Sequence, residues 1–161
     1  MYGEESEIKN YNRKRSGFIM VKNVAIGIQQ FNEIREKDYY YIDKTPFIKE
    51  WWESGDSVTL ITRPRRFGKT LNMSMLEQFF SVEYGGREDL FKGLKIWEDE
   101  NYRNIQGTYP VINLSFANIK EISYEATREK ICEILVDLYI KYSFLRECDI
   151  FTEKDRCYFD R

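Results

Sequence analysis

Helical spacing of apolar residues and short β-branched runs divide the chain into predicted elements. Thr45 and Pro46 predict a helix start, as the N-cap and the first helical residue. This helix is expected to run to about Trp52, and Gly55 ends it. Residues 58–62 are β-branched and mostly apolar, which predicts a buried strand.

A similar pattern follows further along the chain. Five apolar residues at helical spacing predict a core-facing helix: Leu71, Met75, Leu76, Phe79 and Phe80. Residues 111–116 predict a second strand that begins after Pro110. A long amphipathic helix is predicted from one further set: Tyr124, Thr127, Ile131, Leu135, Leu138 and Tyr142. The order of strands and helices predicts an α/β fold with a mostly parallel sheet.

Composition narrows the classes of function. The 161 residues suffice for one domain, and 25 Lys and Arg against 27 Asp and Glu leave a net charge of −2. A dedicated duplex-binding module should be more basic overall. The chain has no histidine, which excludes imidazole catalysis and most zinc sites. Cys132, Cys148 and Cys157 lack close spacing and are interpreted as reduced thiols.

The beginning of the chain and its overall hydropathy lead to predictions about location. Residues 1–22 mix both charges without periodicity and are predicted to be a flexible lead-in to a domain over residues 23–161. No run is apolar and long enough for a secretory signal or a membrane span. We therefore expect a cytoplasmic protein without membrane contact.

One tripeptide, Gly68-Lys69-Thr70, has the composition of a phosphate-binding loop. It lies between a predicted strand and a predicted helix, where backbone N–H groups and the helix dipole attract an anion. A lysine there can reach the terminal phosphates of a nucleotide, and the threonine hydroxyl can bind Mg²⁺. The full motif has glycine five residues before Gly68, whereas this chain has Arg63.

Four cations occur within seven residues of this loop: Arg63, Arg65, Arg66 and Lys69. In a chain of net charge −2, this concentration favours a polyanionic ligand, with nucleotide phosphates as the first interpretation. A nucleic-acid contact and a solvated basic turn paired with surface carboxylates are the alternatives. The sequence does not decide whether Arg63 and Arg65 contact phosphate or pair with acidic groups.

Several ordered blocks of the sequence resemble one family. The stretch RPRRFGKT (residues 63–70), followed by a helix of the type LxxSxLxxFF, is similar to the signature of the AAA-ATPase-like family of bacterial P-loop proteins. Residues 26–45, ending in Asp43-Lys44-Thr45, together with residues 90–96 and 109–116, resemble its other blocks. Arg63 in place of glycine is usual in that family. The resemblance extends over about residues 24–140.

The resemblance implies a P-loop NTPase-like, three-layer αβα domain that binds ATP and Mg²⁺. It implies Lys69 as the catalytic ligand of the β- and γ-phosphates and Thr70 as the metal ligand. The other nucleotide-binding residues implied are Arg63, Arg65, Arg66, Phe67 and Gly68. Asp43 and Lys44 are either local capping and ion-pair residues or residues that shape the nucleotide pocket.

Departures from the family pattern concern hydrolysis. Ser115 stands where the family commonly has aspartate, and no acidic Walker-B-type strand end occurs before Arg161. The acidic run Glu98 to Glu100 is interpreted as a solvated turn. We therefore expect the N-terminal, incomplete part of an ATPase, with slow or no hydrolysis by itself. Nucleic acid is a possible partner through a nuclease-like region beyond Arg161, and the oligomeric state is left open.

Overall fold

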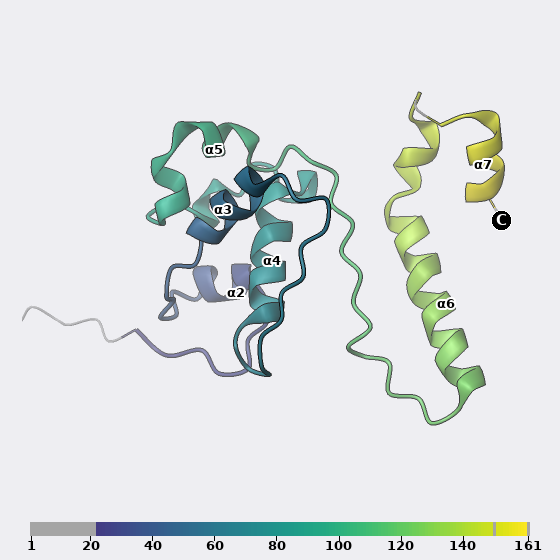
Figure 1. Cartoon of the computed structure of the whole chain (residues 1–161), viewed down its shortest axis with the longest axis horizontal. Helices are drawn as coiled ribbons and strands as arrows, with labels where there is room; N and C mark the ends of the chain where they lie inside the picture. Colours follow the sequence, from purple (N-terminus) through teal and green to yellow (C-terminus); the bar gives the residue numbers. More distant parts are fainter. Residues whose placement is uncertain (1–21, 150, 161) are drawn as a thin grey trace, which may run out of the picture. The chain divides into compact units, whose positions relative to one another are not determined.

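The computed structural model describes residues 22–149 and 151–160, which divide into two compact units after Val111 (Figure 1). The predicted flexible lead-in lies outside the described residues apart from Lys22. The first unit contains α2 (Phe31–Glu36), α3 (Pro46–Ser54), α4 (Lys69–Phe80), η1 (Val82–Tyr84), η2 (Glu88–Leu90), η3 (Lys95–Glu98) and α5 (Glu100–Ile105). The second contains α6 (Tyr124–Lys141), η4 (Ser143–Glu147) and α7 (Glu153–Phe159).

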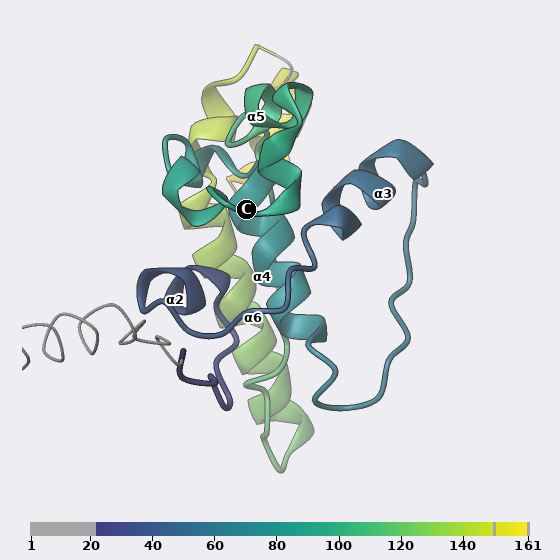
Figure 2. The same cartoon turned by 90° about the vertical axis from the view of Figure 1, so that its left-hand side faces the viewer.

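Helix α3 forms where the sequence predicts it. Thr45 is the residue before the helix, Pro46 opens it, and Gly55 ends it in the left-handed conformation with φ 64°. The extended segment 55–68 then leaves the end of α3 and returns to the first turn of α4, as Figure 2 shows. This segment joins the two helices and contains residues 63–68 of the predicted phosphate loop, while Lys69 and Thr70 belong to α4.

The core of the first unit is aromatic and is built around α4. Met75 and Phe79 are completely buried, and Phe80 is nearly so, which confirms the helical spacing of the sequence. The Phe79 ring packs edge-on against Phe91 with centroids 5.0 Å apart, and Phe91 stacks on Phe31 of α2 at 5.2 Å. These contacts fix the C-terminal half of α4 on the rest of the unit.

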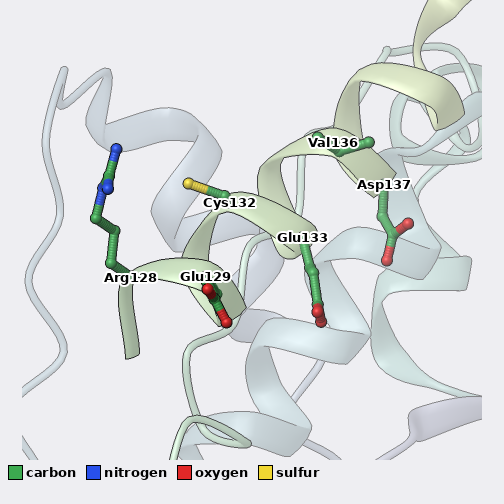
Figure 3. A pocket seen from close by; sticks show the side chains of 6 residues that line it. All are labelled: Arg128, Glu129, Cys132, Glu133, Val136 and Asp137. Atoms are coloured by element: carbon green, nitrogen blue, oxygen red, sulfur yellow. The ribbon is translucent and has the colours of Figure 1, made fainter. Parts of the chain in front are cut away.

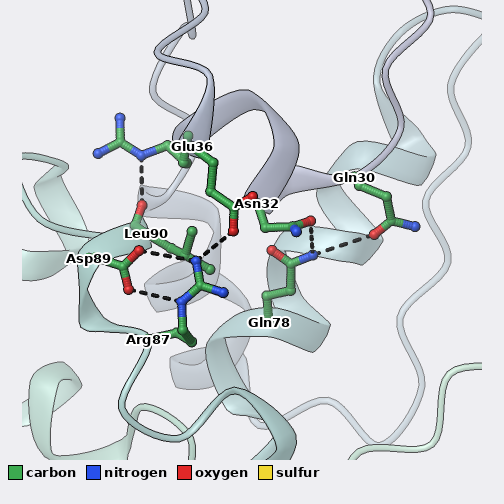
Figure 4. A network of polar contacts seen from close by, with 8 residues as sticks. Gln30, Asn32, Glu36, Gln78, Arg87, Asp89 and Leu90 are labelled. Carbon is green, nitrogen blue, oxygen red and sulfur yellow. Dashed lines mark hydrogen bonds and ion pairs between the residues drawn. The ribbon is translucent and has the colours of Figure 1, made fainter.

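A polar network holds α2 against the same helix (Figure 4). The buried Gln78 side chain on α4 donates to Asn32 Oδ1 at 3.0 Å and to the Ser74 hydroxyl at 3.1 Å. That hydroxyl donates to Gln30 Oε1 and accepts from the Phe31 backbone N–H. Because buried polar groups cost free energy unless they are paired, this network fixes the position of α2 along α4.

The end of α4 is joined to the segment that follows α5. Gly107 N–H donates to the Phe79 carbonyl, and Tyr109 N–H donates to the Phe80 carbonyl, each at 2.8 Å. Gly107 has φ 68°, and a Cβ at this position would lie only 2.6 Å from Gly85 Cα. The backbones of Gly85 and Gly107 approach so closely that there is no space for a side chain at Gly107.

The predicted α/β fold is wrong, because the described residues form no sheet. Residues 58–62 and 111–116 are extended but are not strands of a sheet, and the only β-contacts in the described ranges are isolated bridges between Val24 and Tyr40 and between Ser81 and Tyr109. Val58 and Leu60 are 86% and 83% exposed instead of buried. A strand needs a partner for its backbone groups, and β-propensity alone does not supply one.

The second unit is helical. Helix α6 confirms the predicted long helix, and the Ser123 hydroxyl caps it by accepting from Ala126 N–H at 3.1 Å. None of its described residues is buried, so its predicted apolar face is only partly covered. Thr152 and Asp155 form a capping box at the start of α7. Across the described ranges, no helix is both long and apolar enough to span a bilayer.

Candidate functional site

The predicted phosphate loop makes a sharp turn directly before α4. Arg66 has φ 69° and Gly68 has φ 76°, while Phe67 between them has a negative φ. A left-handed conformation is unusual for arginine and costs free energy. Left-handed residues in a tight turn occur in backbone concavities that bind anions. The loop therefore has a conformation suited to an anion in front of the helix.

Helix α4 begins at Lys69 without a side-chain cap, and its first turn contains no acidic residue. Its first backbone N–H groups therefore lack the acceptor that a capping side chain supplies. Lys69 is half-buried, and its ammonium donates to the Arg63 carbonyl. Thr70, also in the first turn, is exposed. The ammonium thus lies against the loop that precedes its own helix.

The cations of the loop have no acidic partners in the part of the chain that the structure describes. Arg63, Arg65 and Arg66 are exposed, and neither they nor Lys69 form an ion pair with a described carboxylate. The alternative of a basic turn paired with surface carboxylates finds no support within these ranges. The positive end of a helix dipole repels nearby cations, and a bound anion would relieve this repulsion.

A cleft of about 580 Å³ opens beside the loop. Its walls are residues 43–44, the first turns of α3, the extended segment 59–63 and Asn72 on α4. Asn72 Oδ1 is buried and has no hydrogen-bond partner among the described residues. Trp51 Nε1 donates to the hydroxyl of Thr59 at 3.1 Å, which joins α3 to the wall of this α3–α4 cleft.

Lys44 approaches the loop from across this cleft. Its ammonium would lie 3.3 Å from a Cβ placed on Gly68, so it stands directly against the last residue of the loop. Like the loop cations, Lys44 forms no ion pair with a carboxylate in the described ranges. Lys44 therefore lies next to the predicted phosphate site and is not neutralised by an ion pair with a described carboxylate, although Asp43 and Glu50 also line the cleft.

Asp43 fixes the segment that carries Lys44. Its Oδ1 accepts from the backbone N–H and the hydroxyl of Thr45, at 2.9 and 2.6 Å. Its Oδ2 accepts from Lys95 N–H at 2.8 Å, and the fully buried Thr45 hydroxyl accepts from Ile96 N–H. Burial raises the pKa of Asp43, but these hydrogen bonds outweigh it and hold the pKa below its usual value.

Asp43→Asn should therefore destabilise the protein in a pH-dependent way. At pH 7 we expect a loss of about 1 kcal/mol, since solvent reaches the carboxylate and weakens its hydrogen bonds. A depressed folded-state pKa stabilises above the unfolded value near 3.9, and this stability disappears as the pH falls through the folded pKa. Urea unfolding at pH 7 and near pH 3 tests this, and a gap that stays constant would contradict it.

A second hollow, of about 530 Å³, lies along α6 in the other unit. Figure 3 shows its lining as two neighbouring rows, in each of which the residues are about one helical turn apart: Arg128, Cys132 and Val136, and Glu129, Glu133 and Asp137. All six side chains come from one helix, and spacing of four residues alone places them in rows. This hollow contains no residue of the predicted site.

The structure brings together residues that the sequence could only suggest. Lys69 and Arg63 contact each other as part of the predicted loop, whereas the place of Lys44 beside Gly68 depends on tertiary structure. Asn72 was missed, although it lies three residues after Lys69 in the same helix. Asp99 in the acidic run caps α5 and pairs with Lys49 at 3.1 Å, so it has a local role. Within the described ranges, no three Asp, Glu or Cys side chains gather as a metal site.

Comparison with known proteins agrees with the resemblance. The sequence matches the family described as predicted AAA-ATPase (AAA-ATPase-like) over residues 25–157. It is also 38% identical, over 115 residues, to an uncharacterized protein in the vnfD 5' region of Azotobacter chroococcum mcd 1. That match covers 71% of this chain and 21% of the relative, so the chain spans about a fifth of the relative's length. No solved structure matches the chain.

An uncapped helix start behind a cationic loop is an arrangement in which an anion, commonly a phosphate, can be bound. The chain belongs to the AAA-ATPase-like family.

Proposed function

We propose that the first unit binds a nucleoside triphosphate with Mg²⁺ through residues 63–70. The observation that carries this proposal is the turn at Arg66 and Gly68, which leads into the uncapped start of α4 among cations that no described carboxylate neutralises. A polyphosphate suits these residues because it accepts hydrogen bonds from backbone N–H groups and neutralises several cations together.

Lys69 and Thr70 have separate roles in this proposal. On binding, the Lys69 ammonium leaves the neutral Arg63 carbonyl and donates to a charged phosphate oxygen, which is a stronger acceptor. The exposed Thr70 hydroxyl would supply one oxygen ligand to Mg²⁺. Phosphate oxygens and water would supply the others, as is usual for this ion. Bound Mg²⁺ lowers the negative charge that the loop must neutralise.

The activity of the whole protein extends this proposal. The family is described as a predicted AAA-ATPase, which supports nucleotide binding. We propose that ATP hydrolysis in the longer protein drives a conformational step that acts on another domain or on nucleic acid. The described residues supply no acidic metal cluster for hydrolysis, so we expect this chain to bind ATP with slow turnover or none.

Lys69→Ala tests nucleotide binding directly. We expect its affinity for MgATP to fall about 30- to 100-fold, because one charge-assisted hydrogen bond to phosphate is lost. Isothermal titration at moderate salt measures this, and an unchanged thermal midpoint shows that the fold is retained. Equal binding by the wild type and the variant, or no binding by either, would contradict the proposal.

The exposed arginines favour a second candidate function, a contact with nucleic acid. Arg63, Arg65 and Arg66 could bind backbone phosphates without any nucleotide. Such binding would weaken steeply with salt, and the slope would fall when these arginines are replaced. It would also be insensitive to competing MgATP, which separates it from the first proposal.

A further inference from the structure

Lys44 is a cation close to the phosphate loop but not part of it. An ordinary side chain at Gly68 would place its Cβ 3.3 Å from the Lys44 ammonium. The left-handed φ of 76° at Gly68 and this close approach both favour glycine. The absence of a side chain therefore leaves space for the ammonium beside the first turn of α4.

The backbone of Lys44 is held rigidly on both sides. Its N–H donates to the Tyr41 hydroxyl at 3.3 Å, and that hydroxyl contacts Met75 Sδ in the core. On the other side, Asp43 and the buried Thr45 are hydrogen-bonded to residues 95–96. The side chain of Lys44 takes no part in these bonds. The segment therefore places the Lys44 ammonium against the loop, and the ammonium makes none of the hydrogen bonds that hold the segment.

The position of Lys44 is unfavourable without an anion. The Lys44 ammonium lies beside Gly68 at the start of α4, and no carboxylate in the described ranges forms an ion pair with it. The positive end of the α4 dipole repels a cation placed there. A ligand with several negative charges would convert this repulsion into attraction.

We propose that Lys44 is a second lysine that binds the polyphosphate of the nucleotide, from the side of the α3–α4 cleft. This inference rests on the proposed function of the loop. Lys44 contacts the phosphates and not the nucleoside, so the affinity for inorganic pyrophosphate should depend on Lys44 as the affinity for ATP does. Its contribution comes from its ammonium, and arginine can partly replace it.

The test compares Lys44→Met with Lys44→Arg in the full chain. Lys44→Met should bind MgATP and magnesium pyrophosphate about tenfold more weakly, and Lys44→Arg should stay within about threefold of the wild type. Lys92→Met is the matched control: it removes the same charge from an exposed lysine that lies outside the cleft, and it should bind normally. If Lys44→Met does not fold, Lys44→Gln replaces it.

The outcomes separate this inference from the proposed function. If Lys69→Ala loses affinity but Lys44→Met binds as the wild type does, the role of Lys44 is wrong and the phosphate loop stands. If Lys44→Met weakens ATP but not pyrophosphate, Lys44 binds the nucleoside and the inference is also overturned. If the wild type binds neither ligand, or if Lys69→Ala binds normally, the proposed function itself fails.

Discussion

Phe79→Ala should lower the free energy of unfolding by about 3–5 kcal/mol. The side chain is completely buried, and its ring packs against Phe80 and Phe91 with centroids 5.0 Å from each. Removing the ring loses burial and leaves a cavity that the neighbouring rings cannot fill completely. Because domains of this size are stable by only about 5–15 kcal/mol, the loss is a large fraction of the total.

Urea unfolding followed by far-ultraviolet circular dichroism measures this loss. Phe116→Ala is the matched control, since it makes the same chemical change at a residue that is 53% exposed, and it should cost less than about 1 kcal/mol. Phe79 lies at the opposite end of α4 from Lys69, so the apparent affinity for MgATP should fall only in proportion to the fraction of the variant that is unfolded. Equal losses for the two variants would show that α4 does not carry the core.

Gly107→Ala should be nearly as damaging, with a loss of about 3 kcal/mol. Two costs add at this position. Alanine at φ 68° is strained by about 1 kcal/mol, and its Cβ would lie 2.6 Å from Gly85 Cα and 3.0 Å from Gly85 N. Backbone atoms cannot rotate away as a side chain can, so the two segments must separate at a further cost of about 1–3 kcal/mol.

Gly93→Ala provides the control for strain alone. Gly93 has φ 80° but nothing within 4 Å of an added Cβ, so only the conformational cost applies, about 1 kcal/mol. The difference between the two variants measures the close approach of Gly85 and Gly107. Thermal unfolding and urea titration should give the same order. If both variants lose the same stability, the backbones are not in contact in solution.

The helices could be predicted from sequence because their signals are local. Thr45, Pro46 and Gly55 mark the ends of α3, and the spacing of Met75, Phe79 and Phe80 marks the buried face of α4. The absence of a sheet in the described residues could not be predicted in the same way. Residues 58–62 have strand-forming side chains, but a strand also needs a partner distant in sequence, and none of the described residues provides one.

The residues of the candidate site, too, could be predicted only where the signal is local in the sequence. The loop, its cations and the start of α4 are contiguous, so Gly68, Lys69 and Thr70 could be proposed from their order alone. Lys44 could not be placed, because its approach to the loop depends on tertiary structure. Asn72 lies in the same helix as Lys69, but its place in the cleft wall depends on how α3 and residues 59–63 lie beside α4. The hydrogen bonds of Asp43 and Thr45 to residues 95–96 connect distant parts of the sequence in the same way.

The hydrogen bond between Trp51 and Thr59 gives the protein an intrinsic optical signal. The indole of Trp51 packs 5.6 Å from Phe80 on the core side, while its N–H bonds to the wall of the α3–α4 cleft. Indole emission responds to hydrogen bonding and to local polarity, so a ligand that shifts Thr59 changes the fluorescence of Trp51. Replacing Trp52 and Trp97 with phenylalanine would isolate this signal and allow unlabelled nucleotides to be titrated by emission alone.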